Sequence, residues 1–144
     1  MQDRPTYAEL LDAVRHFLET EVVPNLEGPR KFHARVAANV LGIVDRELKA
    51  EDAQLRAEYD RLAQLLGSHE PAPSERHPLR QVIREHTKAL CARIASGEAD
   101  ESTWRKAVLA HVRATVREKL EVANPRYLEA DDRLQANRKS GYIG

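Results

Sequence analysis

The stretch FHARVAANVLGIVDREL, residues 32–48, has the periodicity of one amphipathic helix, which we expect to run from about Pro29 to about Lys49. At about 100° per residue, its large apolar side chains fall on one wide arc of that helix. In angular order the arc contains Phe32, Ile43, Val36, Val40, Val44, Ala37, Leu48 and Leu41; its expected core face, which we call the apolar arc, is Phe32, Val36, Val40, Val44 and Leu48. Polar side chains occupy one margin of it. We therefore expect the apolar arc to face a core and the polar margin to remain at the surface.

The rest of the chain has the same helical character. Aromatic residues make up only 5% of the sequence, and no run of alternating Val, Ile or Thr is bounded by turn residues, so no sheet is expected. Ala, Leu, Arg and Glu dominate, while glycines and prolines cluster between the periodic segments. The sequence predicts an all-α protein, a helical bundle of about five helices with a polar C-terminal tail.

Local signals set the boundaries of the helices in the first half of the chain. Thr6 and Glu9 are the two halves of a capping box, so the first helix should begin at Thr6. The segment PNLEGP, residues 24–29, ends it with two prolines and a glycine. After the helix that contains the apolar arc, a third helix should extend to Gly67 as its C′ residue. Its inward side chains are Leu55, Tyr59, Leu62 and Leu66.

Prolines set the boundaries of the helices in the second half of the chain. Residues 67–78 contain three prolines and form a Pro-rich internal loop, so a fourth helix should begin near Pro78 and a fifth should stop before Pro125. The expected core residues are Leu79, Val82, Ile83, Leu90 and Ile94 in the fourth helix and Trp104, Val108, Val112 and Val116 in the fifth. Together these signals predict one helical domain over residues 1–128 and a polar tail over 129–144.

Length and charge narrow the classes of function. A chain of 144 residues has the size of a single domain and can bury about 70% of its unfolded surface. Its net charge of +0 offers no field to attract nucleic acid or an anionic membrane, so neither is an expected partner. The single cysteine, Cys91, excludes an intramolecular disulfide, and we see neither a signal peptide nor a membrane-spanning run. We expect a cytoplasmic protein of bacterial type.

Three histidines fall on inward faces of the predicted helices: His33, His86 and His111. One interpretation is a metal or general-base site in the interior of the bundle. The other is that each imidazole is hydrogen-bonded in a half-buried seam. The chain has no Glu-x-x-His pair, no zinc pattern of Cys and His, and no His-Glu-x-x-His helix, so we expect no metal and keep the histidine seam only as an alternative.

Motifs for covalent chemistry and for cofactors are also missing from the sequence. Cys91 flanks an apolar arc, where a thiol behaves as a small hydrophobe. There is no nucleophile elbow, no phosphate-binding Gly-rich loop and no dinucleotide fingerprint. We expect no cofactor, no catalytic residue and no independent catalytic activity.

The polar margin beside the apolar arc is a candidate binding site. Arg35, Asn39 and Arg46 are spaced at i, i+4 and i+11, so these donors line one edge of the helix. Such an edge suits a carboxylate, a phosphate or the acidic patch of a partner protein. The alternative is a solvated edge whose arginines pair with nearby glutamates.

A second candidate is the block VANPRYL, residues 122–128. Asn124 precedes a proline and stops the helix, after which Arg126 and Tyr127 present a guanidinium and an aromatic ring on a rigid turn. Arg and Tyr are enriched at protein interfaces. The alternative is a C-terminal stop that folds back on the bundle.

The blocks MQDRPTYAELLDAVRHFLETEVVP, FHARVAANVLGIVDREL, LAQLLG and HVRATVREKLEVANPRYL resemble a small uncharacterised all-helical bacterial family, a domain of unknown function. The resemblance covers most of residues 1–66 and 98–128, and it is absent from residues 67–97 and after 129. Members of that family are found beside phosphotransferases of the aminoglycoside-kinase fold and acyl-CoA dehydrogenases. The matching positions in this chain are His33, Arg35, Asn39, Asn124, Arg126 and Tyr127.

What the resemblance implies is association. We expect a non-catalytic accessory subunit that binds an aminoglycoside-phosphotransferase-like kinase, and possibly an acyl-CoA dehydrogenase, in (hydroxy)acyl-CoA catabolism. The alternative is a homo-oligomeric helical bundle that binds a small ligand or metal at the seam of His33, His86 and His111.

Overall fold

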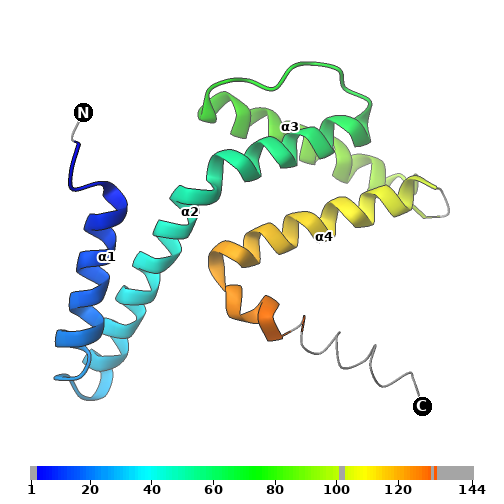
Figure 1. Ribbon diagram of the computed structural model, residues 1–144. Helices are drawn as coiled ribbons and strands as arrows, with labels where there is room; N and C mark the ends of the chain where they lie inside the picture. Colours follow the sequence, from blue (N-terminus) through cyan, green and yellow to red (C-terminus); the bar gives the residue numbers. More distant parts are fainter. Residues whose placement is uncertain (1–2, 101–102, 131, 133–144) are drawn as a thin grey trace, which may run out of the picture. The chain divides into compact units, whose positions relative to one another are not determined.

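The computed structural model describes residues 3–100, 103–130 and 132 of the chain. Its elements, in order, are α1 (Tyr7–Phe17), the π-helical turn η1 (Leu18–Val22), α2 (Gly28–Leu66), α3 (Arg76–Ala95) and α4 (Trp104–Ala123) (Figure 1). These described residues contain five helices and no strand, which confirms the all-α prediction. None of their helices combines the length and the apolar composition needed to cross a bilayer.

The chain divides into two compact units, unit 1 (residues 1–49) and unit 2 (residues 50–144). Both units take part of α2, because the division falls after Lys49. The predicted domain of residues 1–128 spans both, and its being a single domain stays a prediction. Nearly all of the predicted tail, residues 131 and 133–144, lies outside the described part of the chain.

The second and third predicted helices are one helix in the structure. α2 runs without interruption from Gly28 to Leu66, so the predicted boundary near Lys49 is wrong. The reason is local: no proline or glycine lies between Ile43 and Leu66, and Ala, Leu, Glu, Lys and Gln in this stretch all favour a helix. The end of α2 is as predicted, since Gly67 follows it with φ +71°.

Unit 1 begins with the predicted capping box. The Thr6 hydroxyl accepts a hydrogen bond from the Glu9 amide at 3.3 Å, and the Glu9 carboxylate accepts one from the Thr6 amide at 2.7 Å. α1 then lies beside the first part of α2 (Figure 1), and Arg15 of α1 comes within 3.7 Å of where a Cβ on Gly42 would stand. Unit 1 is therefore a helical hairpin.

The apolar arc of α2 is exposed, which contradicts its predicted place in a core. Its exposed fractions run from 63% at Phe32 to 37% at Leu48. Between residues 28 and 49, the buried positions are Ala38 and Gly42. α1 lies along this narrow face, where the Arg15 side chain reaches Gly42, and the larger side chains of the apolar arc remain outside. Periodicity identified the residues that share a face of α2 and not the face that packs.

Unit 2 has a true apolar core. One cluster of buried side chains joins α2, α3 and α4, and its members are Tyr59, Leu62, Ala63, Leu65, Leu79, Ile83, Leu90 and Val108. Most of these positions were predicted from periodicity. Three predicted core residues, Ile94, Val112 and Val116, are instead between 37% and 50% exposed. They lie on the margins of the buried stripes of α3 and α4.

Polar contacts position the helices around this core. The Trp104 indole donates to the Leu65 carbonyl at 3.1 Å, which fixes the start of α4 against the end of α2. Arg76 forms two hydrogen bonds to Asp52, at 2.6 and 2.9 Å, which lower the pKa of the Asp52 carboxyl. The buried Glu51 carboxylate pairs with Arg76 and Arg80. α3 is thereby held to α2 at its first turns, and it begins two residues before the predicted Pro78.

We expect Leu62→Ala to lower the free energy of unfolding by about 2–5 kcal/mol, because Leu62 has no exposed surface and truncation leaves a cavity in the core. Leu109→Ala is the matched control, since Leu109 is 44% exposed on α4 and its loss should cost less than about 1 kcal/mol. Urea denaturation followed by circular dichroism measures both. Equal losses for the two variants would contradict the core described here.

Candidate binding site

The predicted polar margin of α2 is at the surface of unit 1. Arg35 and Asn39 are exposed and Arg46 is half-buried. By helical geometry the three lie within about 40° of one another around the helix axis, and about 120° from Val40 at the middle of the apolar arc. The structure thus places these three predicted site residues on one edge of α2, at the margin of the apolar arc, where Asn39 lies about 20° from Phe32 around the axis.

A glycine brings a fourth residue to this edge. Gly42 lies in the interior of α2, and a Cβ there would stand 3.3 Å from an Arg46 guanidinium nitrogen and 3.7 Å from an Arg15 guanidinium nitrogen. The two guanidinium groups, one from each helix of the hairpin, therefore converge over the bare backbone of Gly42. We call Arg15, Arg35, Asn39 and Arg46 the polar edge.

Sequence reasoning missed Arg15 and Gly42. The available signal was Gly42 itself, because a glycine inside a helical pattern costs about 1 kcal/mol relative to alanine and usually has a packing or functional reason. Arg15 could not be assigned, since its place beside α2 depends on how the hairpin packs.

The polar edge can bind oxyanions. A guanidinium presents several donors in a plane that matches carboxylate and phosphate oxygens, and the Asn39 amide adds a donor and an acceptor. Carboxylates also lie close: Asp12 accepts from Arg15 at 3.1 Å, and Asp45 accepts from Lys49 at 2.7 Å. A ligand or partner must therefore compete with Asp12 for Arg15, and this favours a ligand with more than one oxyanion group.

The second predicted group lies in unit 2, in the turn after α4. Asn124 ends that helix with a non-helical backbone, as predicted, and residues 125–130 are helical again. Its carbonyl accepts from the Tyr127 amide at 3.0 Å, which fixes the turn. Asn124 and Arg126 are exposed, and Tyr127 is 59% exposed. The turn thus presents its guanidinium and its ring to the surface and does not fold them onto the core.

The three histidines lie in different surroundings. His33 is exposed in unit 1, with its ring 5.7 Å from that of Phe32, so its predicted inward position is wrong for the same reason as the apolar arc. His86 stacks on Tyr59 at 5.6 Å, and His111 is buried on α4. Within the described residues, no group of three or more His, Cys, Asp or Glu side chains is placed to hold a metal ion.

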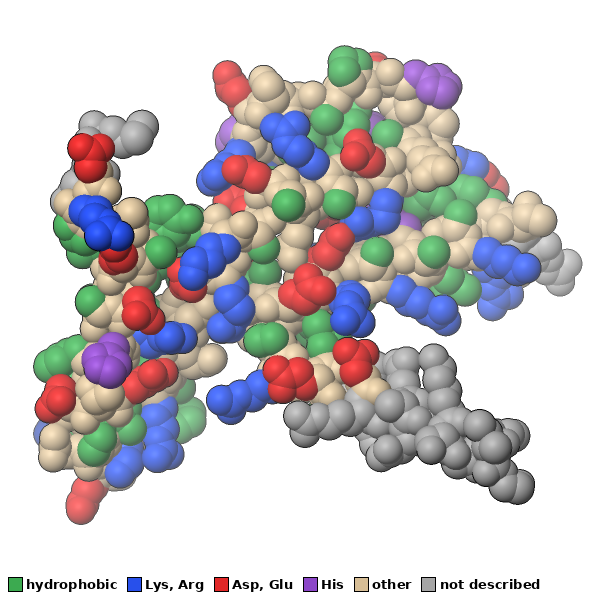
Figure 2. Space-filling view, in the orientation of Figure 1, with side chains coloured by type: hydrophobic (Ala, Val, Ile, Leu, Met, Phe, Trp, Pro, Cys, Tyr) green, Lys and Arg blue, Asp and Glu red, His purple; other side chains and the backbone are tan. Residues whose placement is uncertain are grey.

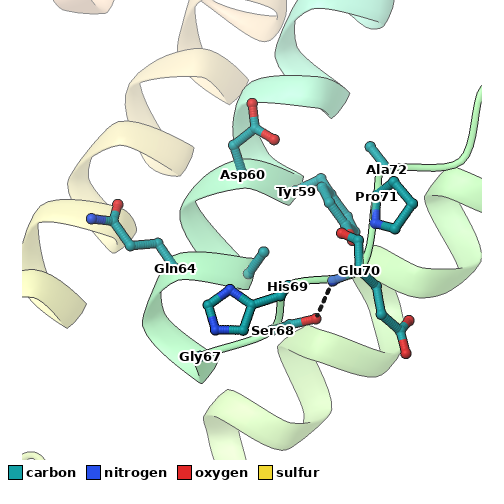
Figure 3. A pocket seen from close by; sticks show the side chains of 10 residues that line it. Tyr59, Asp60, Gln64, Gly67, Ser68, His69, Glu70, Pro71 and Ala72 are labelled. Atoms are coloured by element: carbon teal, nitrogen blue, oxygen red, sulfur yellow. Dashed lines mark hydrogen bonds between the residues drawn. The ribbon is translucent and has the colours of Figure 1, made fainter.

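The loop after α2 borders an open hollow of about 480 Å³ in unit 2. The Tyr59 hydroxyl donates to the Glu70 carbonyl at 2.6 Å and ties the loop to the core. The polar ends of Asp60, Gln64 and Glu70 point in different directions (Figure 3). A ligand site needs polar groups that converge on one point, so this hollow is a weaker candidate than the polar edge.

A comparison with models of protein families gives a match to this chain. The model of a family described as Domain of unknown function (DUF6285) matches residues 24–127. The chain belongs to this family. No curated protein and no solved structure gives a match. The predicted resemblance to a domain of unknown function is thus confirmed.

The region of the chain that matches DUF6285 contains both predicted sets of binding residues. Arg35, Asn39, Arg46 and the turn of residues 124–127 all fall inside it, as does Gly42. α1 precedes the matched region, so Arg15 is an addition to the DUF6285 part of the polar edge.

Half-buried polar groups surround the buried His111 in the DUF6285 region. Arg61 of α2 pairs with Glu118 of α4 through two hydrogen bonds, at 2.8 and 2.6 Å. Burial lowers the pKa of His111, and the Arg61 charge lowers it further, while Glu118 raises it. In the described part of the chain, three buried atoms of this region have no hydrogen-bond partner: His111 Nδ1, Arg61 Nε and Thr115 Oγ1. Burial and the Arg61 charge therefore favour the neutral form of the His111 imidazole.

We expect the free energy of unfolding to decrease as the pH falls below about 6.5, the ordinary pKa of histidine. The pKa of folded His111 is lower than that of the unfolded chain, so the unfolded chain binds this proton first and is favoured by acid. His111→Gln should remove this part of the pH dependence, while His16→Gln, at an exposed position of α1, should keep it. Urea denaturation between pH 5.5 and 7.5 measures the free energy of unfolding. Equal slopes of this free energy against pH for the two variants would contradict the assignment to His111.

Proposed function

We propose that this protein is a non-catalytic accessory subunit that binds an aminoglycoside-phosphotransferase-like kinase and supports its action on (hydroxy)acyl-CoA substrates in the cytoplasm. The observation that carries the binding role is the polar edge, where the guanidinium groups of Arg15 and Arg46 converge over Gly42. We assign this edge to the kinase.

The chemistry of the polar edge supports a protein partner with an acidic patch. Arginine is enriched at protein interfaces, and paired guanidinium groups bind carboxylates with defined geometry. Arg126 and Tyr127 add an exposed cation and an aromatic ring in unit 2, the residue types most often found as binding hot spots. They are a second contact in the proposal.

The class of the partner rests on the resemblance of the sequence blocks to a family found beside such kinases and acyl-CoA dehydrogenases. The dehydrogenase is the second partner in the proposal. The single cysteine of the chain supports a reducing compartment such as the cytoplasm, because secreted domains of this size commonly use pairs of cysteines.

The variant Gly42→Ala tests kinase binding separately from the stability of the fold. Alanine gains about 0.5–1 kcal/mol of helix stability over glycine. Its methyl group would stand 3.3 Å from the flexible end of Arg46, so the guanidinium groups must shift while the helix is unharmed. We expect an unchanged or higher melting temperature and about 10-fold weaker kinase binding, measured by differential scanning calorimetry and isothermal titration calorimetry.

Two arginines of α2 make it possible to separate the effect of position from the effect of losing one positive charge. Arg35→Ala should weaken kinase binding, whereas Arg30→Ala, which removes the same charge from an exposed position on the other side of α2, should not. Kinase activity on an acyl-CoA substrate should rise when the unaltered protein is added. The proposal fails if no complex forms, or if Gly42→Ala and Arg35→Ala bind as Arg30→Ala does.

A further inference from the structure

α4 exposes three aliphatic side chains beside its buried side. Leu109, Val112 and Val116 are 44%, 44% and 50% exposed. At about 100° per residue they lie within about 60° of one another around the helix axis. Val108 and His111, on the buried side of the same helix, are 5% and 7% exposed. We call Leu109, Val112 and Val116 the heptad stripe, for the reason that follows.

The spacing of this stripe is that of a coiled coil. Residues at i, i+3 and i+7 take positions a, d and a of a heptad, which are the positions that contact a second helix. Leu109 and Val116 take a, and Val112 takes d. Lys106 and Arg113 then take the e positions, which flank such a contact and select its partner by charge. Both lie about 40–60° from Leu109 around the axis.

The cations beside the heptad stripe are not neutralised by the chain itself. Residues 103–117 contain four cations and no carboxylate. Figure 2 shows Lys and Arg side chains along α4, the helix labelled in Figure 1. Lys106 and Arg113 are exposed, and neither forms an ion pair within the described part of the chain. A negative charge that complements this face must therefore come from another molecule.

Other cations of unit 2 have a structural role. On α3, Arg76 and Arg80 pair with the buried Glu51 of α2, and Arg93 pairs with Glu98. These pairs hold the helix and the turn after it in place. The two e-position cations of α4 make no such contact, so the fold of unit 2 gives no reason for their charge.

The apolar and the basic parts of this face together indicate the kind of partner. The phosphate backbone of a nucleic acid would use the cations and leave the heptad stripe in water. A membrane surface binds helices in proportion to the apolar area that they insert, and three half-exposed aliphatic side chains offer little of it. A helix with apolar a and d positions and acidic flanks would cover the stripe and also pair with the cations.

We propose that the heptad stripe binds an amphipathic helix of another protein whose flanking positions carry Glu or Asp. The apolar side chains of that helix pack on Leu109, Val112 and Val116, and its carboxylates pair with Lys106 and Arg113. This surface lies in unit 2 and does not include the polar edge. The proposal therefore goes beyond the proposed kinase binding and does not rest on it.

The test uses the full chain and a synthetic peptide of about three heptads, with Leu at a and d and Glu at e and g. A second peptide carries Lys in place of every Glu. Isothermal titration calorimetry measures both dissociation constants. We expect the acidic peptide to bind and the basic peptide not to bind. The affinity for the acidic peptide should fall as the salt concentration rises, because ions screen the exposed charge pairs.

Charge variants test the residues of this face. Arg113→Glu should raise the dissociation constant of the acidic peptide by about 10-fold or more, because a repulsion replaces an attraction. Arg84→Glu is the matched control, since it makes the same change of charge at an exposed position of α3 and should leave the constant within about 2-fold. The double variant Lys106→Glu, Arg113→Glu should bind the basic peptide in place of the acidic one. Because these side chains are exposed, every variant should keep its helical circular dichroism.

Three results would overturn the proposal: no binding of the acidic peptide at about 100 μM, equal binding of both peptides, or an equal effect of Arg113→Glu and Arg84→Glu. Duplex DNA and phosphatidylserine vesicles are tested in parallel. If either binds through Arg113 while the acidic peptide does not bind, the face belongs to that partner and the proposal is wrong. No kinase is present, so failure here leaves the accessory role standing, and failure of the kinase complex leaves this surface standing.

Discussion

Both units depend on one continuous helix, α2. Nothing in its sequence between Ile43 and Leu66 interrupts the backbone hydrogen bonds, so the helix that carries the polar edge in unit 1 also carries Tyr59, Leu62 and Leu65 into the core of unit 2. The side of α2 that is buried differs between its two parts. In unit 1 the narrow side with Ala38 and Gly42 is covered, and in unit 2 the side with large apolar residues is covered.

This difference in burial explains the distribution of candidate sites. Unit 2 packs its helices around an apolar core and joins them by specific polar contacts. Examples are the pair of Arg61 with Glu118 and the hydrogen bond of Trp104 to the Leu65 carbonyl. Unit 1 has a glycine where two arginines approach the backbone, and apolar side chains that remain exposed. A stable core needs no partner to exclude water from its side chains, whereas an exposed apolar face does. Unit 1 therefore carries the residues on which the proposed binding role rests.

The polar edge and the apolar arc of α2 offer different kinds of interaction. The polar edge offers guanidinium donors, whose contribution depends on geometry and on competition with Asp12 for Arg15. The apolar arc offers exposed apolar area, whose contribution depends on removing side chains from water. Their centres lie about 120° apart around α2, and they meet where Asn39 borders Phe32.

Several features of this protein were determined by sequence alone. The all-α class, the capping box of Thr6 and Glu9, the glycine that ends α2 and the stop before Pro125 all follow from interactions among residues close in the chain. The inward positions of Tyr59, Leu62 and Ile83 followed from periodicity, because unit 2 covers the widest apolar stripes of its helices.

Only the tertiary structure decided which side of a helix is covered. Periodicity places Phe32, Val36 and Val40 on one face, and the same pattern describes a core face and an interface that awaits a partner. The hairpin packs instead on the side of α2 that carries Ala38 and Gly42, where the Arg15 side chain of α1 reaches Gly42. The convergence of Arg15 with Arg46 follows from that packing, since residues 31 positions apart meet only when two helices fold together.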